Sequence, residues 1–451
     1  MRIIDSLAEA QATILHRRPL EQVALPPHVA QRIREVFGAA LTAEQVVDRV
    51  IAEVRRDGDA ALLRLTAAID GVALSPSDGP PGPFAVGPDQ IAAAYDVVPA
   101  ALVGALRLAA QRIEEFHRRQ VPRSWTDFSP AGGLGQLIVP LQRVGVYAPG
   151  GRAVYPSTVL MTAVPARVAG VSEIVLASPP GRDGRLSPLV LVAADIARVD
   201  RVFAIGGAQA IAALAYGTAS VPQVDKILGP GNLFVTLAKK KVFGQVAIDQ
   251  LAGPTETVIV ADQTADPRAV ALDLLAQAEH DPLASAILIT TSRSLAEQVD
   301  IRIASLLQRL PRAEVARQAL EANGGAVVVP DVAAALALAN AYAPEHLCLL
   351  VADPWSWVGH VRNAGGLFLG EHSPEAMGDY IAGPSHVMPT GGTARFASPL
   401  SVFDFVKITS LIALSAAEMA ALGPTAAAIA DAEGLTAHAA AIRARLACQH
   451  E

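Results

Sequence analysis

The stretch VFAIGGAQAIAALAYGTASVPQV, residues 202–224, carries no charged side chain and is long enough to cross a bilayer as a helix. Its small and helix-breaking residues argue against that interpretation. Gly206-Gly207 follows the apolar start, and Pro222-Gln223 stands near the end. We therefore interpret the stretch as a strand, a turn, a helix and a loop of an α/β protein.

The same alternation continues on both sides of this stretch. In the first series, strands are predicted at 144–146, 174–177, 202–205 and 226–228, with helices at 189–197 and 209–215. After Ala252-Gly-Pro254, a second series has strands at 257–261, 287–290, 326–329 and 347–351, with helices at 269–278 and 295–307. Buried parallel strands joined by helical crossovers give this rhythm. The predicted fold is α/β, with two incomplete Rossmann-like parallel-sheet domains.

The two ends of the chain have a different pattern. Residues 1–125 are predicted to be a helical segment, with its clearest helix at 101–120 and a breaker-rich surface loop at 75–83. From residue 396 the chain is Ala-rich, and we predict a helical tail that packs on another part of the assembly because it has little core of its own. The predicted domains are 1–125, 126–250, 251–395 and 396–451.

Composition excludes several classes of protein. A net charge of -7 over 451 residues gives no basic footprint for nucleic acid, and Lys239-Lys240-Lys241 suits the end of a helix. Only two cysteines occur, Cys348 and Cys448, which excludes a disulfide scaffold and fits a reducing compartment. The first residues lack the pattern of a signal peptide. We expect a soluble cytoplasmic protein that binds neither nucleic acid nor membrane.

Three predicted strands of the first series end in glycine-containing loops. These are Tyr147-Ala-Pro-Gly150-Gly151, Gly206-Gly207-Ala-Gln209 and Gly229-Pro-Gly-Asn232. Ligands of open α/β sheets collect beyond the carboxyl ends of the strands, where backbone amides can face phosphate. One such loop would be an ordinary turn, but three of them in one half predict a nucleotide site.

The second half carries scattered acid, amide and imidazole side chains. They are Gln277, His280, Glu345, His346, Asp379, Glu433 and His438. Imidazole nitrogens and oxygen donors are zinc ligands, and a redox or hydrolytic centre also needs an acid/base group. Each fragment alone has an ordinary explanation as a helix end, a turn or a surface residue. Together they indicate an enzyme with a zinc site beside a general base.

Long motifs in this chain resemble those of the histidinol dehydrogenase family. The motifs are Gly229-Pro-Gly-Asn232, Ile248-Asp-Gln-Leu-Ala-Gly-Pro-Thr-Glu256, Asp273-Leu-Leu-Ala-Gln-Ala-Glu-His280, Ala343-Pro-Glu-His346, Gly378-Asp-Tyr380, Gly383-Pro-Ser-His386 and Glu433-Gly-Leu-Thr-Ala-His438. N-terminal fragments around Gly58-Asp59 and Phe116-His117 are similar to the family as well, so the resemblance covers nearly the whole chain.

The resemblance implies an activity and a set of site residues. The family oxidises L-histidinol to L-histidine through an aldehyde, in two NAD-dependent steps with one zinc ion per subunit. By this resemblance the zinc ligands are Gln277, His280, Asp379 and His438, and the acid/base pair is Glu345 and His346. Tyr147, Gln209 and Asn232 would contact NAD. The substrate would contact Thr255, His386 and Glu433 as well as Gln277, His280, His346, Asp379 and His438. In the family, the equivalents of Glu433 and His438 come from the partner subunit of an intertwined homodimer with shared active sites.

This chemistry assigns separate tasks to the acid/base pair. His346 would take the hydroxyl proton of the alcohol as hydride leaves. Glu345 would activate the water that converts the aldehyde to a gem-diol before the second hydride transfer. A cysteine thiohemiacetal is the alternative route, and Cys348 is its candidate. Because Cys348 lies in an apolar strand, we predict that it is structural.

Three positions depart from the family pattern, and other functions stay open. Thr255 stands where the family usually has serine, Ser385 where it has asparagine, and Met388 where it has leucine.

One alternative function is the oxidation of another small diol, including a sulfonated one. A zinc hydrolase using Glu345 as base would leave the predicted NAD contacts unused, and an inactive structural oligomer would need neither ligand.

Overall fold

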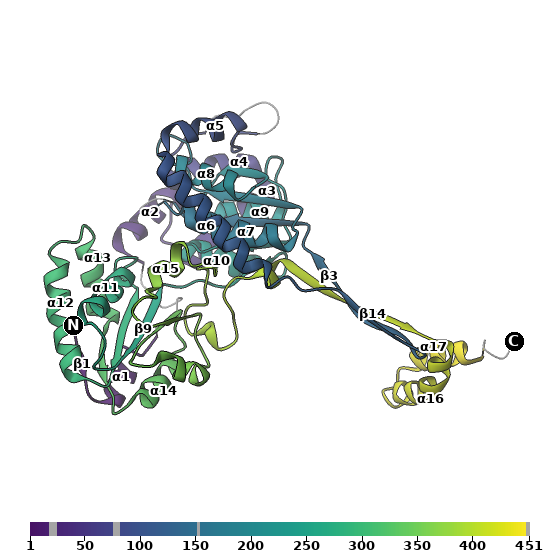
Figure 1. Ribbon diagram of the computed structural model, residues 1–451. Helices are drawn as coiled ribbons and strands as arrows, with labels where there is room; N and C mark the ends of the chain where they lie inside the picture. The colour runs from purple at the N-terminus through teal and green to yellow at the C-terminus, as the bar shows by residue number, and fades with distance from the viewer. Residues whose placement is uncertain (18–24, 75–81, 151–153, 448–451) are drawn as a thin grey trace.

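The computed structural model describes residues 1–17, 25–74, 82–150 and 154–447. Figure 1 shows a body of two α/β units, from which a long arm of antiparallel strands projects and ends in a pair of helices. The predicted loop at 75–83 lies largely outside the described residues, as do Gly151 and Cys448.

The first unit is built on a five-stranded, fully parallel sheet in the order β6-β5-β4-β7-β8. Its strands are β4 (Arg143–Tyr147), β5 (Glu173–Ser178), β6 (Arg201–Ala204), β7 (Lys226–Leu228) and β8 (Ala247–Ile248). Its helices are α7 (Pro156–Ala169), α8 (Pro188–Ile196), α9 (Gly207–Tyr216) and α10 (Leu233–Val242). Two separate apolar clusters cover the sheet, one with α7 and α8 and the other with α9 and α10. Strands covered on both faces become almost continuously apolar, which is why residues 202–224 resemble a membrane segment.

Most N-terminal helices pack on this first unit. They are α2 (Pro27–Phe37), α3 (Ala43–Asp57), α4 (Asp59–Leu65), the π-helical turn η2 (Thr66–Asp70), α5 (Pro88–Val97) and α6 (Ala100–Arg118). α3 contacts α9 and α10, and α6 contacts α7. Among the described residues, no single helix is long and apolar enough to cross a membrane. Among those residues, only α5 and α6 taken together have the length and composition of a membrane span, and the chain bends by 116° between them.

The second unit contains a six-stranded parallel sheet in the order β1-β11-β10-β9-β12-β13. The strands are β1 (Ile3–Ile4), β9 (Glu256–Ala261), β10 (Ser285–Thr290), β11 (Gly325–Val328), β12 (His346–Leu350) and β13 (Gly366–Leu369). The helices are α1 (Leu7–Ala12), α11 (Pro267–Ala278), α12 (Arg293–Leu307), α13 (Ala313–Asn323), α14 (Val332–Tyr342) and α15 (Glu375–Tyr380). The predicted fold class of two parallel-sheet units is confirmed.

Two features of the chain ends differ from the predicted helices. The first residues form β1, which extends the second sheet rather than joining the N-terminal helices. The tail begins with a short 3₁₀ turn, η5 (Val402–Phe405), and the strand β14 (Val406–Leu414) before the helices α16 (Ala416–Ala432) and α17 (Thr436–Ala447). β14 pairs with β3 (Gly132–Pro140), which also pairs with β2 (Trp125–Ser129), in a three-stranded antiparallel sheet. The expectation of a wholly helical tail is therefore wrong at 406–414. The limits of the four predicted domains stay a prediction.

Candidate active site

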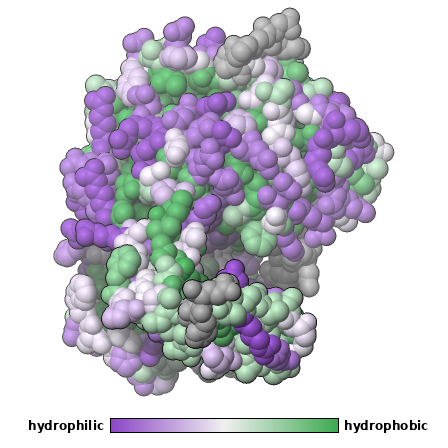
Figure 2. Space-filling view, turned by 90° about the vertical axis from the view of Figure 1, so that its right-hand side faces the viewer, coloured by the Kyte–Doolittle hydropathy of each residue, from purple (hydrophilic) through white to green (hydrophobic). Residues whose placement is uncertain are grey.

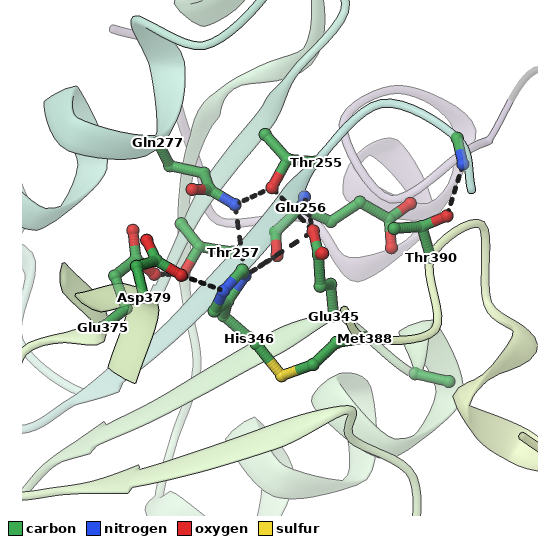
Figure 3. Close-up of polar contacts among 12 residues, drawn as sticks. Thr255, Glu256, Thr257, Gln277, Glu345, His346, Glu375, Asp379, Met388 and Thr390 are labelled. Atoms are coloured by element: carbon green, nitrogen blue, oxygen red, sulfur yellow. Dashed lines mark hydrogen bonds and ion pairs between the residues drawn. The ribbon is translucent and has the colours of Figure 1, made fainter. Parts of the chain in front are cut away.

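The acid/base residues meet at the amino-terminal edge of the second sheet. Thr255 immediately precedes β9, and Glu345 and His346 stand at the start of β12. Because β9 and β12 are paired in parallel, their first residues lie side by side. Gln277, in the last turn of α11, and Asp379, on α15, approach the same point (Figure 3).

The Glu345 carboxylate is buried but well supplied with hydrogen bonds. It accepts from the Thr255 hydroxyl at 2.6 Å and from the Glu256 backbone N–H at 3.1 Å. Burial raises the pKa of Glu345 to about 7. A carboxyl with a pKa near neutrality can both take and return a proton, which suits a general acid/base.

His346 lies between two carboxylates. Its Nδ1 is 3.1 Å from the Glu256 carbonyl and 3.6 Å from the Glu345 carboxylate, while its Nε2 is 3.8 Å from Asp379 Oδ1. Burial lowers the pKa of His346, but the nearby carboxylates, Glu345 first among them, outweigh it and raise this pKa to about 10. Within the described chain, the buried Nε2 has no hydrogen-bond partner. An unsatisfied buried nitrogen facing Asp379 is a suitable place for a ligand's polar group.

Three residues of one subunit could hold a metal ion. Gln277 uses its amide nitrogen for contacts with Thr255 and His346, and Figure 3 shows its amide oxygen on the other side. Asp379 is partly buried, which raises its pKa, but His346, His386 and His280 outweigh this effect and lower the pKa. An amide oxygen, an imidazole and a carboxylate fit zinc if a fourth ligand comes from elsewhere.

His280 and Asp379 lie at or just beyond the end of a helix. α11 ends at Ala278, so His280 lies in the turn beyond the helix, joined to it by its backbone N–H to the Gln277 carbonyl. Asp379 lies on α15, directly after Gly378. No three His, Cys, Asp or Glu side chains of the described chain cluster as a metal site by themselves. The predicted zinc ligands therefore stay a prediction, and they would need an amide oxygen and a ligand from outside the subunit.

His386 connects the site to the first unit. Its Nδ1 is 2.9 Å from the Asp379 carbonyl, and its Nε2 is 3.2 Å from the Thr158 hydroxyl on α7. Thr158 was not predicted from the sequence, because its role depends on the packing of α7 against the other unit. The neighbouring Ser385 hydroxyl donates to the Met161 carbonyl at 3.0 Å. Ser385, one of the three departures from the family pattern, therefore contacts α7 and not the acid/base pair.

Two buried acids near the site were also missed. Glu375 accepts a hydrogen bond from the Thr257 hydroxyl at 2.8 Å, and burial raises the pKa of Glu375 to about 7. Glu256 forms a two-point ion pair with Arg17, with distances of 2.6 and 2.8 Å. The only available signal for Glu375 was its position one helical turn before Asp379.

The three glycine-containing loops open onto one cavity of about 820 Å³. Tyr147, Gln209 and Asn232 all line it, at the carboxyl ends of β4, β6 and β7. The Tyr147 hydroxyl accepts from the Gly207 N–H at 3.0 Å, and the Gln209 amide donates to Asp70 at 3.1 Å. The Asn232 side-chain oxygen caps α10, which leaves its amide nitrogen for a ligand. The cavity has the position and size expected of a dinucleotide site.

Two of the predicted site residues lie apart from this constellation, whereas Cys348 lies on the strand that begins with His346. Glu433 and His438 are exposed on the terminal helices, at the far end of the arm from the body (Figure 1). The structure of one subunit therefore does not bring them to the acid/base pair. Cys348 is fully buried in β12, and burial raises the pKa of its thiol well above the ordinary value. Such a thiol is a poor nucleophile.

Comparison with known proteins places these motifs in one family. The model of the histidinol dehydrogenase family matches residues 37–446. A histidinol dehydrogenase of Deinococcus radiodurans is 51% identical over 441 residues, which cover 97% of this chain and 98% of that protein. One of Moorella thermoacetica is 55% identical, covering 91% and 97% of the two chains. The crystal structure of histidinol dehydrogenase from Elizabethkingia anophelis superposes with a TM-score of 0.89 at 33% identity, covering 100% of this chain and 98% of that chain. The chain therefore belongs to the histidinol dehydrogenase family.

Proposed function

We propose that this protein oxidises L-histidinol to L-histidine through the aldehyde, with two successive hydride transfers to NAD, as the final step of histidine biosynthesis. Family membership supports the reaction class. The observation that carries the proposal is the buried pair of Glu345 and His346, which lies beside Asp379 at one edge of the second sheet.

Zinc would be held by Gln277, His280 and Asp379 of one subunit and by His438 of the partner subunit. When bound, zinc supplies a Lewis-acidic centre that chelates the amino and imidazole groups of histidinol. His386, Thr255 and the partner's Glu433 would complete the substrate contacts. Fixing the substrate at several points holds its carbinol carbon in one orientation, which favours hydride transfer.

In the first oxidation, His346 accepts the proton of the substrate hydroxyl as hydride leaves for NAD. The carboxylates of Glu345 and Asp379 stabilise the imidazolium that forms, because they lie 3.6 and 3.8 Å from its two nitrogens. Their position favours the imidazolium over the neutral ring, so a positive charge such as zinc beside Asp379 would have to lower the pKa of His346 before the neutral ring can act as the base.

In the second oxidation, Glu345 accepts a proton from the water that adds to the aldehyde. The hydrogen bonds from Thr255 and Glu256 orient the carboxylate for this task. As the water adds, protonated His346 returns its proton to the aldehyde oxygen, which completes the gem-diol. The neutral ring then accepts a hydroxyl proton of the gem-diol as the second hydride leaves. Cys348 has no part in this route, since its buried thiol resists ionisation.

NAD would bind in the cavity lined by Tyr147, Gln209 and Asn232. A zinc hydrolase would have no use for a cavity of about 820 Å³ at the carboxyl ends of three strands. We place the reaction in the cytoplasm, because the chain has only two cysteines, which fits a reducing compartment.

An intertwined homodimer with shared active sites would explain the arm. Its strands and terminal helices expose large apolar side chains, among them Phe128 at 80%, Ile412 at 72% and Ile429 at 57%. Green surface gathers around the arm when the molecule is viewed from the side to which it projects (Figure 2). Apolar surface of this extent marks an interaction site, and a second copy would cover it while delivering Glu433 and His438.

The test is NADH absorbance with purified, zinc-loaded protein, NAD and limiting L-histidinol. Two NADH per histidinol, lost on chelation and restored by zinc, is the expected result. If an intact, metal-loaded protein forms no NADH with histidinol, another small diol must replace it as the substrate.

A further inference from the structure

Lys239 is buried inside the first unit. The sequence places it in the run Lys239-Lys240-Lys241, which we expected to be an ordinary cationic helix end. That expectation suits Lys241, which pairs at the surface with Asp48. Lys239, however, is 1% exposed and forms an ion pair with Asp249, whose side chain is also buried. A buried ion pair needs a reason, because desolvation of both charges is costly.

Both charges of this pair hold the backbone of one residue, Gly229. The Lys239 ammonium donates to the Gly229 carbonyl at 2.8 Å, and the Asp249 carboxylate accepts from the Gly229 N–H at 2.7 Å. Gly229 also lies against β4: a Cβ there would stand 2.1 Å from the Tyr147 carbonyl oxygen. The loop that carries Asn232 is thus fixed between the Tyr147 backbone and the ion pair.

The same pair reaches toward the second unit through residues 249–253, which connect the two sheets. Asp249 accepts from the Gln250 N–H at 2.6 Å, and the Gln250 amide donates to the Met388 carbonyl at 2.6 Å. Further along, the Gly253 N–H donates to the Thr390 hydroxyl at 2.6 Å. Residues 388–390 begin two residues after His386, so the connection ties the cofactor loop to the segment that carries a proposed substrate contact.

We propose that the Lys239–Asp249 ion pair is a positioning device that holds the Gly229–Asn232 loop in the geometry that binds NAD. The inference rests on the proposed NAD site. Neither residue lines the cavity, so the pair acts through the loop backbone and does not touch the ligand. Misplacement of a binding group by about 1 Å can cost on the order of 100-fold in rate, which explains why two charges are kept around one glycine.

Three variants test the proposal in the zinc-loaded, full-length protein. Lys239→Met removes the ammonium and leaves a buried carboxylate without its partner, which can prevent folding. The double variant Lys239→Met with Asp249→Asn removes both charges and retains an acceptor for the Gly229 N–H. Lys241→Met is the matched control, because it removes a lysine of the same helix and its ion pair at the surface.

The expected result is a selective loss of NAD affinity. In the double variant, KM for NAD rises about tenfold or more, while KM for histidinol and bound zinc stay within about twofold of wild type. Hydrogen exchange of a peptide covering residues 227–236 becomes faster, and Lys241→Met matches wild type in each measurement. The exchange readout does not depend on turnover.

Two outcomes would overturn the proposal. A folded double variant with wild-type KM for NAD and wild-type exchange would show that the pair is only structural. Equal losses for NAD and histidinol would show a general disturbance of the fold. Failure of the proposed function can be distinguished from both outcomes, because the wild-type protein itself would then form no NADH with histidinol.

Discussion

His346 illustrates how the environment of one residue determines its chemistry. Burial alone would keep the imidazole neutral, but Glu345 and Asp379 on either side of the ring raise its pKa to about 10. Two buried carboxylates next to one imidazole would repel each other unless a cation lay between them. The imidazolium is such a cation, and with a pKa of about 10 it is the form present at neutral pH. Zinc held at Asp379 would add positive charge beside the ring and lower this pKa, which the proposed role of His346 as a base requires.

His346→Asn should lower kcat by about 10²- to 10⁴-fold, because it removes the general base. Zinc content and NAD affinity should change little, which metal analysis and NAD titration would check. Cys348→Ala is the matched control on the same strand, two residues away and equally buried. A folded Cys348→Ala protein that loses turnover would contradict the water-based second step.

Asp273→Asn should stabilise the protein in a pH-dependent way. Burial raises the pKa of Asp273 from 3.8 to about 6, so ionisation of this carboxyl opposes folding. The loss of folding free energy caused by this ionisation is absent below a pH of about 4. It grows as the pH rises toward the folded-state pKa and is complete above that pKa. The variant should therefore gain about 1–2 kcal/mol at pH 7.5, allowing for partial exposure, and nothing at pH 4.

Denaturant unfolding of Asp273→Asn and wild type, at one protein concentration and both pH values, would measure this gain. Equal gains at pH 4 and 7.5 would attribute the effect to packing of the amide instead of loss of a charge.

Sequence motifs predicted the identity of the site residues better than their contacts. The structure brings Gln277, Glu345, His346 and Asp379 together, but their roles remain predictions. The contacts of Thr158 and Glu375 were not visible in the sequence. Each makes its contact with an element far away in the chain, and a threonine or a glutamate has no local pattern that distinguishes such a contact from an ordinary surface position.

At the scale of elements, the parallel strands were the most predictable part. Each of the eight strands expected at 144–351 occurs, and its ends differ from the predicted ones by no more than two residues. These strands were predictable because buried strands produce unbroken apolar runs. β14 was missed although Val406, Ile408, Ile412 and Leu414 alternate as in a strand. Its partner β3 lies far earlier in the chain, so the pairing leaves no local signal. An Ala-rich sequence follows β14, so local propensity favoured a helix.

Gly229→Ala should impair both stability and NAD binding. Gly229 has φ of +111°, and an added Cβ would meet the Tyr147 carbonyl oxygen at 2.1 Å. Gly244 is the matched control, since it has φ of +101° but no atom within 4 Å of an added Cβ. Gly244→Ala should cost about 1–2 kcal/mol from backbone strain alone, and Gly229→Ala at least about 2 kcal/mol more.

Thermal unfolding and KM for NAD would separate these two glycines. Both variants should melt at a lower temperature, but only Gly229→Ala should raise KM for NAD. Similar values for the two variants would mean that the contact with Tyr147 relaxes at little cost.

The whole molecule is extended in a way that one subunit alone does not explain. The three-stranded sheet and the helices α16 and α17 project away from the body (Figure 1). The small core between those helices consists of Ala427, Ala430 and Ala439, while Leu422, Ile429 and Leu435 are exposed. An arm with so little internal packing is stabilised only when its apolar side chains are covered by another surface.

Shared active sites predict complementation between two inactive subunits. In a heterodimer of His346→Ala and His438→Ala chains, one site has both defects. The other site combines the intact body of the His438→Ala chain with the intact tail of its partner. That site should be fully active, so a heterodimer purified through two different tags should show about half of the wild-type rate. Each homodimer should be inactive. If each tail served its own subunit, both sites of the heterodimer would carry one defect, and its activity would be as low as that of the homodimers.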